Sequence, residues 1–477
     1  MSGLRNLYKF FGLIFIAFGI MFNEWFLARL FSSDSEITTI SFKVAIWLID
    51  ILFILTGSFL VFARNKSFIR ELCINLCVSV ISIFAIFFIL ELLFPFFLPY
   101  LPLNLQAHLD ASIRTLAQNS KKGLIPKNYI AILGDSYAQG IGDWLLNSNE
   151  WKNEKHHSVH LINNALDVDI VSFGSGGVGS IEGIVKFPVC ILETLKQSFK
   201  MEDPKIFLIY FYEGNDLTDN IIDLYNNKYF NNVKEKSKLN KNGFNQFLKT
   251  KIKNKLDKNE FNQFLETRIK NKLGIVKMNL IASRFFLELF KNAVNKLSGK
   301  PIDSAWHCHR PQKLPGKYNL AEINHKQVIL PKHLQAPPLA LNGDKTKIAV
   351  QVFEYSLQFL AKQFPQSSIV VIYIPSVLSC YKLKSDVSIE NLPWFRNRRS
   401  VYPAYLVEEK SSSLAKNIEN ICKNNNIKFL DTRPYIKLSA LQQPVHGPCD
   451  WCHFNKYGYE KFSECIVSYL YKEGLAK

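Results

Sequence analysis

Ser136, His453 and Asp450 are the residues of this chain whose types and spacing could support nucleophilic catalysis. Ser136 ends the tripeptide Gly134-Asp135-Ser136, which directly follows the apolar run 129–133. A serine hydroxyl becomes a good nucleophile only when a neighbouring base removes its proton. Asp450 precedes His453 by three residues, so its carboxylate can fold back, fix the imidazole tautomer and stabilise the charged imidazole. The chain therefore carries the groups for serine attack on a carbonyl, provided that the fold brings them together.

Two other stretches carry groups that could stabilise the negative oxygen formed in such an attack. The run Gly174-Ser175-Gly176-Gly177-Val178-Gly179 follows a second apolar run, and glycine lets a backbone N–H approach a ligand closely because it has no Cβ. Glu213-Gly214-Asn215-Asp216 follows a third apolar run and contributes an amide side chain. Backbone N–H groups and asparagine amides are common donors to an oxyanion.

These stretches must be positioned by the regular structure that precedes them. Five apolar runs alternate with helical patterns, and we expect strands at Tyr129–Leu133, Val168–Phe173, Ile206–Tyr212, Ser368–Ile374 and Ile427–Leu430. The alternation predicts an α/β fold of three layers, with a parallel sheet covered by helices on both faces. The carboxyl ends of parallel strands share one edge of the sheet, and catalytic residues are expected there.

The four blocks, in this order, resemble the SGNH hydrolases, also called the GDSL-like esterase and lipase superfamily. The resemblance covers about residues 127–475, leaving out an insert at about 225–340. It implies an SGNH-like fold in which Ser136 is the nucleophile, His453 is the base, and Asp450 is the carboxylate that orients the base.

The resemblance also implies an oxyanion hole and supporting residues. The implied donors are the Ser136 N–H, the Gly177 N–H and the Asn215 side chain, and Gly176 and Gly179 lie one or two places from the second of these. The implied supporting residues are Gly134, Asp135 and Gly214.

The reaction that the resemblance implies is acyl transfer through a serine ester, without a cofactor. We expect a membrane-anchored, outward-facing esterase that removes an O-acetyl or other acyl group from an acylated glycan or lipid of the cell envelope. Two alternatives stay open. One is an O-acyltransferase that uses the same triad together with a partner membrane protein, and the other is a catalytically silent assembly module that kept the fold.

The N-terminal region contains three apolar runs, at about 10–27, 44–63 and 72–98. Because about 20 apolar residues span a bilayer core, they predict three transmembrane helices. The segment before the first run and the loop after the second run together contain five basic residues, and the first loop contains two. Because basic residues favour the inner side of a membrane, the chain beyond 98 is predicted to face the periplasm or exterior. The expected location is a cell membrane, a bacterial inner membrane. The predicted domains are a membrane domain at 1–103, a linker at 104–126 and the catalytic domain at 127–475.

The insert contains a direct repeat in which FNQFLKTKIKNKL at 244–256 recurs as FNQFLETRIKNKL at 261–273. The region 231–277 has 13 basic and 4 acidic residues. Phe, Leu and Ile recur at helical spacing, so each copy is expected to be a basic amphipathic helix. Such a helix could lie on an anionic membrane surface, or the two copies could form a solvated helical hairpin.

Charge and composition limit the partners that can be expected. The formal net charge of +18 favours anionic surroundings. The basic region lacks an interleaved base-stacking geometry, and we expect no nucleic-acid partner. The histidines at 156, 157, 160, 307 and 309 have no acidic or cysteine partner at a typical ligand spacing, and we expect no metal site.

The C-terminal block allows other interpretations. Cys449-Asp450-Trp451-Cys452-His453 fits the pattern of covalent haem attachment, in which His453 would bind iron and could not serve as a base. A disulfide between Cys449 and Cys452 is another possibility. His446 is a rival base, although no carboxylate lies three residues before it.

Overall fold

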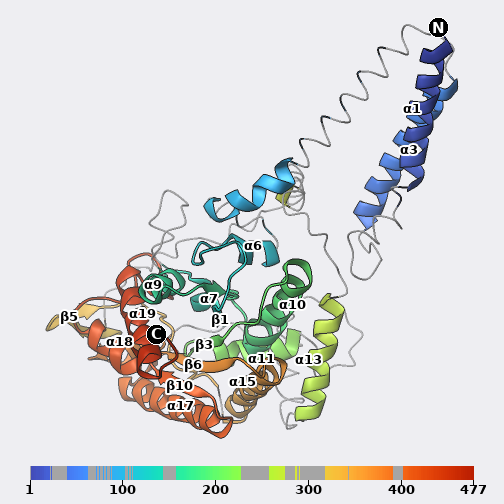
Figure 1. Cartoon of the computed structure of the whole chain (residues 1–477). Helices are drawn as coiled ribbons and strands as arrows, with labels where there is room; N and C mark the ends of the chain where they lie inside the picture. Colours follow the sequence, from blue (N-terminus) through green and yellow to red (C-terminus); the bar gives the residue numbers. More distant parts are fainter. Residues whose placement is uncertain are drawn as a thin grey trace. The chain divides into compact units, whose positions relative to one another are not determined.

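The structure is a computed structural model of the chain, which divides into two compact units (Figure 1). The α/β unit comprises Pro99–Lys196, Lys200–Ile269 and Asn292–Lys477, and the helical unit comprises Met1–Leu98, Gln197–Phe199 and Lys270–Lys291. The structure describes residues 2–21, 23, 40–62, 71, 75, 79, 82, 86, 89–101, 106, 109, 111–142, 157–226, 257–273, 285–286, 289, 317–341, 343–389 and 401–476. The predicted domains at 1–103, 104–126 and 127–475 stay predictions.

The α/β unit is built on a five-stranded parallel sheet in the order β10-β6-β3-β1-β2. The strands are β1 (Ile130–Leu133), β2 (Ile170–Ser172), β3 (Ile206–Tyr212), β6 (Ser368–Ile374) and β10 (Lys428–Asp431). Each predicted strand is present, so the α/β class with a parallel sheet is confirmed. β1 lies between β2 and β3, and the direction in which successive strands are added reverses at this point.

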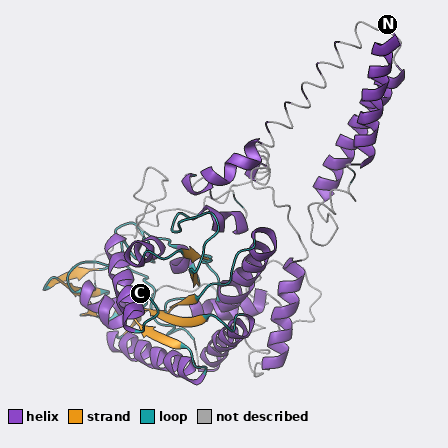
Figure 2. Cartoon of the chain, in the orientation of Figure 1, coloured by secondary structure: helices purple, strands orange, loops and turns teal. Residues whose placement is uncertain are grey.

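Helices cover both faces of this sheet, as Figure 2 shows. The helices of the unit are α6 (Ala111–Ala117), α7 (Ser136–Gln139), α9 (Ser158–Leu166), the π-helix η2 (Ile181–Lys186), α10 (Phe187–Phe199), α11 (Asp216–Asn226), α13 (Lys258–Leu273), α15 (Gly343–Gln363), α16 (Val377–Cys380), α17 (Ala404–Asn424), α18 (Arg433–Ala440) and α19 (Lys456–Lys472).

Alternate residues of β3 pack against opposite helical layers. The Tyr210 ring lies 5.1 Å from the Phe462 ring of α19 on one face. The Phe211 ring lies 4.7 Å from the Phe353 ring of α15 on the other face. All seven residues of β3 are buried, which accounts for its continuous apolar sequence because a strand covered on both faces has no polar side.

Smaller sheets lie outside this core. β4 (Leu320–Ile323) pairs with β5 (Lys326–Ile329) and with β7 (Lys382–Leu383), and both pairings are antiparallel. β8 (Val387–Ser388) pairs with β9 (Val401–Tyr402). The β4–β5 hairpin occupies the end of the predicted insert, where no strand was expected.

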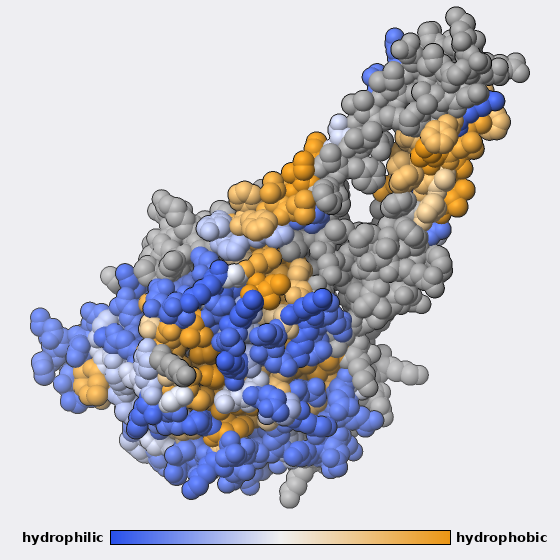
Figure 3. All heavy atoms as spheres, in the orientation of Figure 1, coloured by the Kyte–Doolittle hydropathy of each residue, from blue (hydrophilic) through white to orange (hydrophobic). Residues whose placement is uncertain are grey.

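In the helical unit, α1 (Ser2–Met21) packs antiparallel to α3 (Ile40–Phe62). Glycines allow the two helices to approach closely, since a Cβ on Gly12 would lie 2.7 Å from the carbonyl oxygen of Gly57. The described surface of this hairpin is largely hydrophobic (Figure 3) and includes Leu13, Leu48 and Leu52.

The prediction that three transmembrane helices precede the SGNH-like domain is wrong. Within the described residues, no helix combines the length and apolar character needed to cross a membrane. The sequence of α3 includes Asp50 within the predicted run 44–63, and a charged side chain is costly at bilayer depth. Part of the third run lies outside the described residues; residues 89–97 near its C-terminal end are helical, and the short 3₁₀ helix η1 (Leu98–Tyr100) follows them. The predicted location stays a prediction.

The second copy of the repeat forms α13. This helix begins where the Asp257 carboxylate accepts hydrogen bonds from the N–H groups of Asn259 and Glu260. Phe261 and Leu265 are fully buried, and the Phe261 ring lies 5.8 Å from the Tyr355 ring of α15. The apolar side of this copy therefore packs within the protein instead of lying on a membrane surface. The first copy, 244–256, lies outside the described residues.

We predict that Leu265→Ala destabilises the α/β unit by about 2–5 kcal/mol, because it removes buried methyl groups and leaves a cavity. Urea denaturation followed by circular dichroism measures the change in the free energy of unfolding. Gln263→Ala on the exposed side of α13 is the control and should cost less than about 0.5 kcal/mol. Equal stability of the two variants would contradict the packing of α13 described above.

Candidate active site

Ser136 lies at the carboxyl end of β1, at the start of α7. Gly134 has a φ of +140°, and a Cβ there would lie 2.7 Å from the Tyr210 carbonyl oxygen, so the turn requires glycine. The Asp135 carboxylate accepts a hydrogen bond of 2.9 Å from the Tyr137 N–H and caps α7. These constraints place the Ser136 side chain at the edge of the sheet where the other blocks also lie.

The structure brings the three predicted catalytic residues together. Ser136 Oγ lies 2.8 Å from His453 Nε2, and His453 Nδ1 lies 2.6 Å from Asp450 Oδ2. The other oxygen of Asp450 accepts hydrogen bonds from the N–H groups of Cys452, at 2.8 Å, and His453, at 3.3 Å. This is the serine–histidine–carboxylate arrangement of acyl-transfer catalysis.

The charges and hydrogen bonds around Asp450 and His453 favour an ionised Asp450. Burial opposes ionisation, but the hydrogen bond and positive charge from His453 and the backbone N–H bonds outweigh it, and the pKa of Asp450 is lowered. An ionised carboxylate only accepts hydrogen bonds, so neutral His453 carries its proton on Nδ1. Nε2 is then left as the acceptor for the hydroxyl proton of Ser136.

The loop that carries His453 is held against α7 by Tyr137. The Tyr137 hydroxyl donates a 3.0 Å hydrogen bond to the Cys452 carbonyl oxygen, and its ring lies 5.3 Å from the His453 ring. Tyr137 is fully buried, so this attachment is shielded from water. Sequence reasoning missed Tyr137, although its place directly after the nucleophile, within one helical turn, was a usable signal.

Asn455 closes the other end of the loop. Its side-chain oxygen accepts a 2.9 Å hydrogen bond from the Gly458 N–H and caps α19. Its amide donates to the Pro444 carbonyl oxygen at 2.9 Å. A Cβ on Gly458 would lie 2.3 Å from the Val445 carbonyl oxygen, so α19 can start this close to the loop only with glycine there.

The predicted oxyanion donors follow three neighbouring strands. Ser136, Gly177 and Asn215 come after β1, β2 and β3, and β1 is the middle strand. The Gly176 N–H donates to the Gln139 side chain at 2.7 Å, whereas the Gly177 N–H has no partner within the described residues. Gly177 is therefore the better donor of the two adjacent glycines.

Asn215 and Ser136 differ in how their donors are engaged. No hydrogen bond of the Asn215 side chain occurs within the described residues, and its Oδ1 is buried. The Ser136 N–H opposes the burial that raises the pKa of the Asp135 carboxyl group.

Asp135 and Asp216 are buried carboxyl groups that hold the turns around the site. Burial raises the pKa of Asp135, opposed by the Tyr137 N–H and by the charge of His453. Burial also raises the pKa of Asp216, and the nearby Asp135 charge adds to this effect. Asp216 accepts the Tyr212 N–H at 2.9 Å and fixes the turn after β3.

The alternative sites from the sequence are not favoured by the structure. His446 is fully buried beside Tyr381, and burial lowers the pKa of its imidazole to about 3, so it cannot replace His453 as base. Both ring nitrogens of His453 face Ser136 and Asp450 instead of an open iron site. Cys449 and Cys452 are thiols in this structure. No metal-binding group of three or more ligands occurs in the described part of the chain, and residues 156, 307 and 309 lie outside it.

Comparison with known proteins assigns no family to this chain. No family model matches the chain, and no curated protein matches it. A crystal structure that aligns with 73% of this chain and 97% of its own has 11% sequence identity and a TM-score of 0.26. Similarity at that level supports neither a fold assignment nor an activity, and the family resemblance stays a prediction.

We predict that acid destabilises the α/β unit partly through His446. Its pKa of about 3 in the folded chain is below the value near 6.5 expected in the unfolded chain. The unfolded state therefore binds the proton first, and stability that is complete above about pH 6.5 is lost as the pH falls toward 3, by roughly 1.4 kcal/mol per pH unit.

Urea denaturation at about pH 7 and 5 measures this dependence. His446→Gln should show a shallower loss of stability on acidification than the wild type, because the group that titrates is gone. His325→Gln in an exposed turn is the matched control and should keep the wild-type dependence. The same slope in the wild type and in His446→Gln would exclude His446 as the cause.

Proposed function

We propose that this chain is a serine ester hydrolase of the SGNH type. The observation that carries the proposal is the continuous chain of contacts from Ser136 Oγ to His453 Nε2, at 2.8 Å, and from His453 Nδ1 to Asp450 Oδ2, at 2.6 Å. The side chains of His453 and Asp450 are 17% and 12% exposed, so the pair is largely shielded from water.

The first half of the reaction forms an acyl-enzyme. His453 Nε2 takes the Ser136 hydroxyl proton as Oγ bonds to the carbonyl carbon of the ester. Asp450 stabilises the imidazolium that results. The tetrahedral intermediate then expels the alcohol oxygen, which receives the proton from His453 Nε2, and the acyl group stays on Ser136.

The second half releases the acid. Water loses a proton to His453 Nε2 while its oxygen attacks the acyl carbon. The second tetrahedral intermediate breaks its bond to Ser136 Oγ, and the proton returns to Ser136. The base is used twice in each turnover, and therefore its tautomer must be fixed by Asp450 throughout.

The developing oxyanion is stabilised by the donors that follow β1, β2 and β3. Each donor of this kind contributes about 3–4 kcal/mol to the transition state. The Gly177 N–H and the Asn215 amide are the donors with no partner in the described residues, and both are therefore available to an oxyanion.

An acylated glycan or lipid as the substrate stays a prediction, as does a partner membrane protein. An O-acyltransferase would use the same acyl-enzyme with a sugar hydroxyl in place of water. Turnover of an aryl acetate requires the acyl-enzyme and tests the chemistry common to both.

We predict that Ser136→Ala and His453→Ala each lower kcat for aryl acetate hydrolysis by roughly 10⁴- to 10⁶-fold, because the nucleophile and base act as one unit. A fluorophosphonate should label the wild type at Ser136 and leave Ser136→Ala unlabelled. Released chromophore and mass spectrometry of the labelled peptide are the measurements.

Two variants outside the site control for general effects. Ser463→Ala removes a buried serine of α19, and His325→Ala removes an exposed histidine. Both should keep wild-type rates within about twofold, as expected for substitutions away from the triad. Hydrolysis at the wild-type rate by Ser136→Ala would refute the proposed function, and an unlabelled, inactive wild type would favour the silent assembly module.

A further inference from the structure

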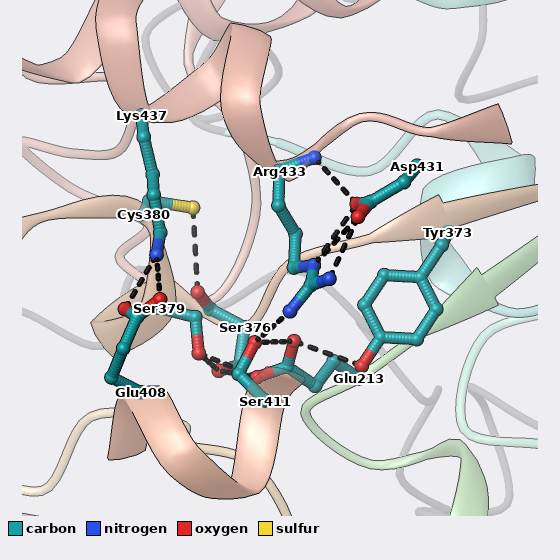
Figure 4. Close-up of polar contacts among 10 residues, drawn as sticks. All are labelled: Glu213, Tyr373, Ser376, Ser379, Cys380, Glu408, Ser411, Asp431, Arg433 and Lys437. Atoms are coloured by element: carbon teal, nitrogen blue, oxygen red, sulfur yellow. Dashed lines mark hydrogen bonds and ion pairs between the residues drawn. The ribbon is translucent and has the colours of Figure 1, made fainter. Parts of the chain in front are cut away.

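Glu213, the first residue after β3, is the centre of a buried cluster of hydroxyl groups (Figure 4). It is 1% exposed. Its carboxylate accepts hydrogen bonds from Tyr373 at 3.0 Å, Ser376 at 2.9 Å, Ser379 at 2.5 Å and Ser411 at 2.8 Å. These donors belong to β6, α16 and α17, so one side chain ties the end of β3 to three other elements.

A cationic group lies at the edge of this cluster. The Arg433 guanidinium donates to Ser411 at 3.1 Å and pairs with Asp431 at 2.7 Å. Burial raises the pKa of Glu213, opposed by the three serine hydroxyl groups and by the charge of Arg433. An apolar side chain would fill such a position without the cost of burying a polar group, so the carboxylate calls for an explanation beyond packing.

The backbone next to Glu213 forms the turn that carries Asn215. The Glu213 N–H donates to the Ile374 carbonyl oxygen at 2.9 Å, and the Asp216 carboxylate accepts the Tyr212 N–H at 2.9 Å. A Cβ on Gly214 would lie 2.5 Å from the Tyr212 ring, which leaves this turn little room to move.

Within the described residues, Asn215 has no hydrogen bond that holds its side chain. Its Oδ1 is buried without a partner, and no side-chain bond of Asn215 occurs within the described residues. Its backbone carbonyl accepts the Asp219 N–H at 2.8 Å. The position of the amide is therefore set by the turn, and within the described residues the Glu213 carboxylate makes more hydrogen bonds to other elements than any other side chain of the turn.

We propose that Glu213 is a positioning residue that fixes the turn after β3 and so aims the Asn215 amide at the oxyanion. The inference rests on the proposed function, since it assigns a role within the same site. Glu213 acts through Asn215, and its effect on the reaction should vanish when the Asn215 amide is removed.

The carboxylate suits this task better than an amide would. It only accepts hydrogen bonds, so all four hydroxyl groups can point their protons at it. Glutamine offers one accepting oxygen, and its NH₂ faces hydroxyl groups that must then turn their protons elsewhere. Displacing a catalytic group by about 1 Å can cost on the order of 100-fold in rate, so a small movement of the turn is enough to be measured.

The test is a double-mutant cycle on aryl acetate hydrolysis with Glu213→Gln, Asn215→Ala and the double variant. Glu213→Gln should lower kcat by about 10- to 100-fold and leave KM within about threefold, because the loss falls on the transition state. Asn215→Ala should lower kcat by about 100- to 1000-fold. The double variant should be no slower than Asn215→Ala alone.

Asp431→Asn is the matched control. It also converts a carboxylate of this cluster to an amide and weakens the ion pair with Arg433, but it lies on β10 and has no bond to the turn. It should keep kcat within about twofold even when its melting temperature falls as far as that of Glu213→Gln. If Glu213→Gln does not fold, Ser379→Ala removes one of the four donors and is carried through the same cycle.

The possible outcomes of these experiments separate the positioning role of Glu213 from the proposed function. Wild-type kcat in Glu213→Gln, or losses that multiply in the double variant, would overturn the positioning role while the active wild type upheld the hydrolase. A loss in Asp431→Asn equal to that in Glu213→Gln would assign the effect to stability and also overturn it. A wild type that neither turns over the ester nor takes the fluorophosphonate would overturn the proposed function itself, and the positioning role with it.

Discussion

The site depends on the place of β1 in the sheet. Because β1 pairs with β2 on one side and β3 on the other, the turns after these three strands open at one edge. Ser136, Gly177 and Asn215 are separated by tens of residues along the chain and still follow adjacent strands. The reversal of strand order at β1 is also where ligands bind in open α/β sheets, because the connections diverge there and leave a crevice.

The segment that carries Asp450 and His453 comes from outside the sheet and is held by hydrogen bonds from tyrosine hydroxyl groups. The segment between α18 and α19 is held beside Ser136 where the Tyr137 hydroxyl donates to the Cys452 carbonyl oxygen. The Tyr459 hydroxyl donates to the Ile141 carbonyl oxygen and ties α19 to the end of α7. The triad geometry is thus maintained by buried tyrosines, whose rings exclude water while their hydroxyl groups find acceptors.

Polar groups around the site divide into two kinds. Asp135, Asp216 and Glu213 are buried and accept hydrogen bonds that fix the turns after β1 and β3. Asn215 is half-buried, and its side chain makes no hydrogen bond within the described residues. A buried polar atom left without a partner costs free energy, and under the proposed function the Asn215 amide gains its partner only when the oxyanion forms.

The sequence by itself determined the five strands and the order of the four blocks, because β-branched runs alternating with helical patterns have few other solutions. It also singled out Ser136, His453 and Asp450 through residue type and short spacing. The prediction of transmembrane helices from the N-terminal apolar runs was wrong, and the sequence did not decide where the repeat packs. An apolar stripe has the same sequence pattern whether it faces lipid or protein. Only the packing of α13 in the tertiary structure decided that Phe261 and Leu265 are buried. The partners of Tyr137, of Gln139 and of the hydroxyl groups around Glu213 could not be found in advance, because they are 37 to 315 residues distant in the chain, and only tertiary packing brings such residues into contact.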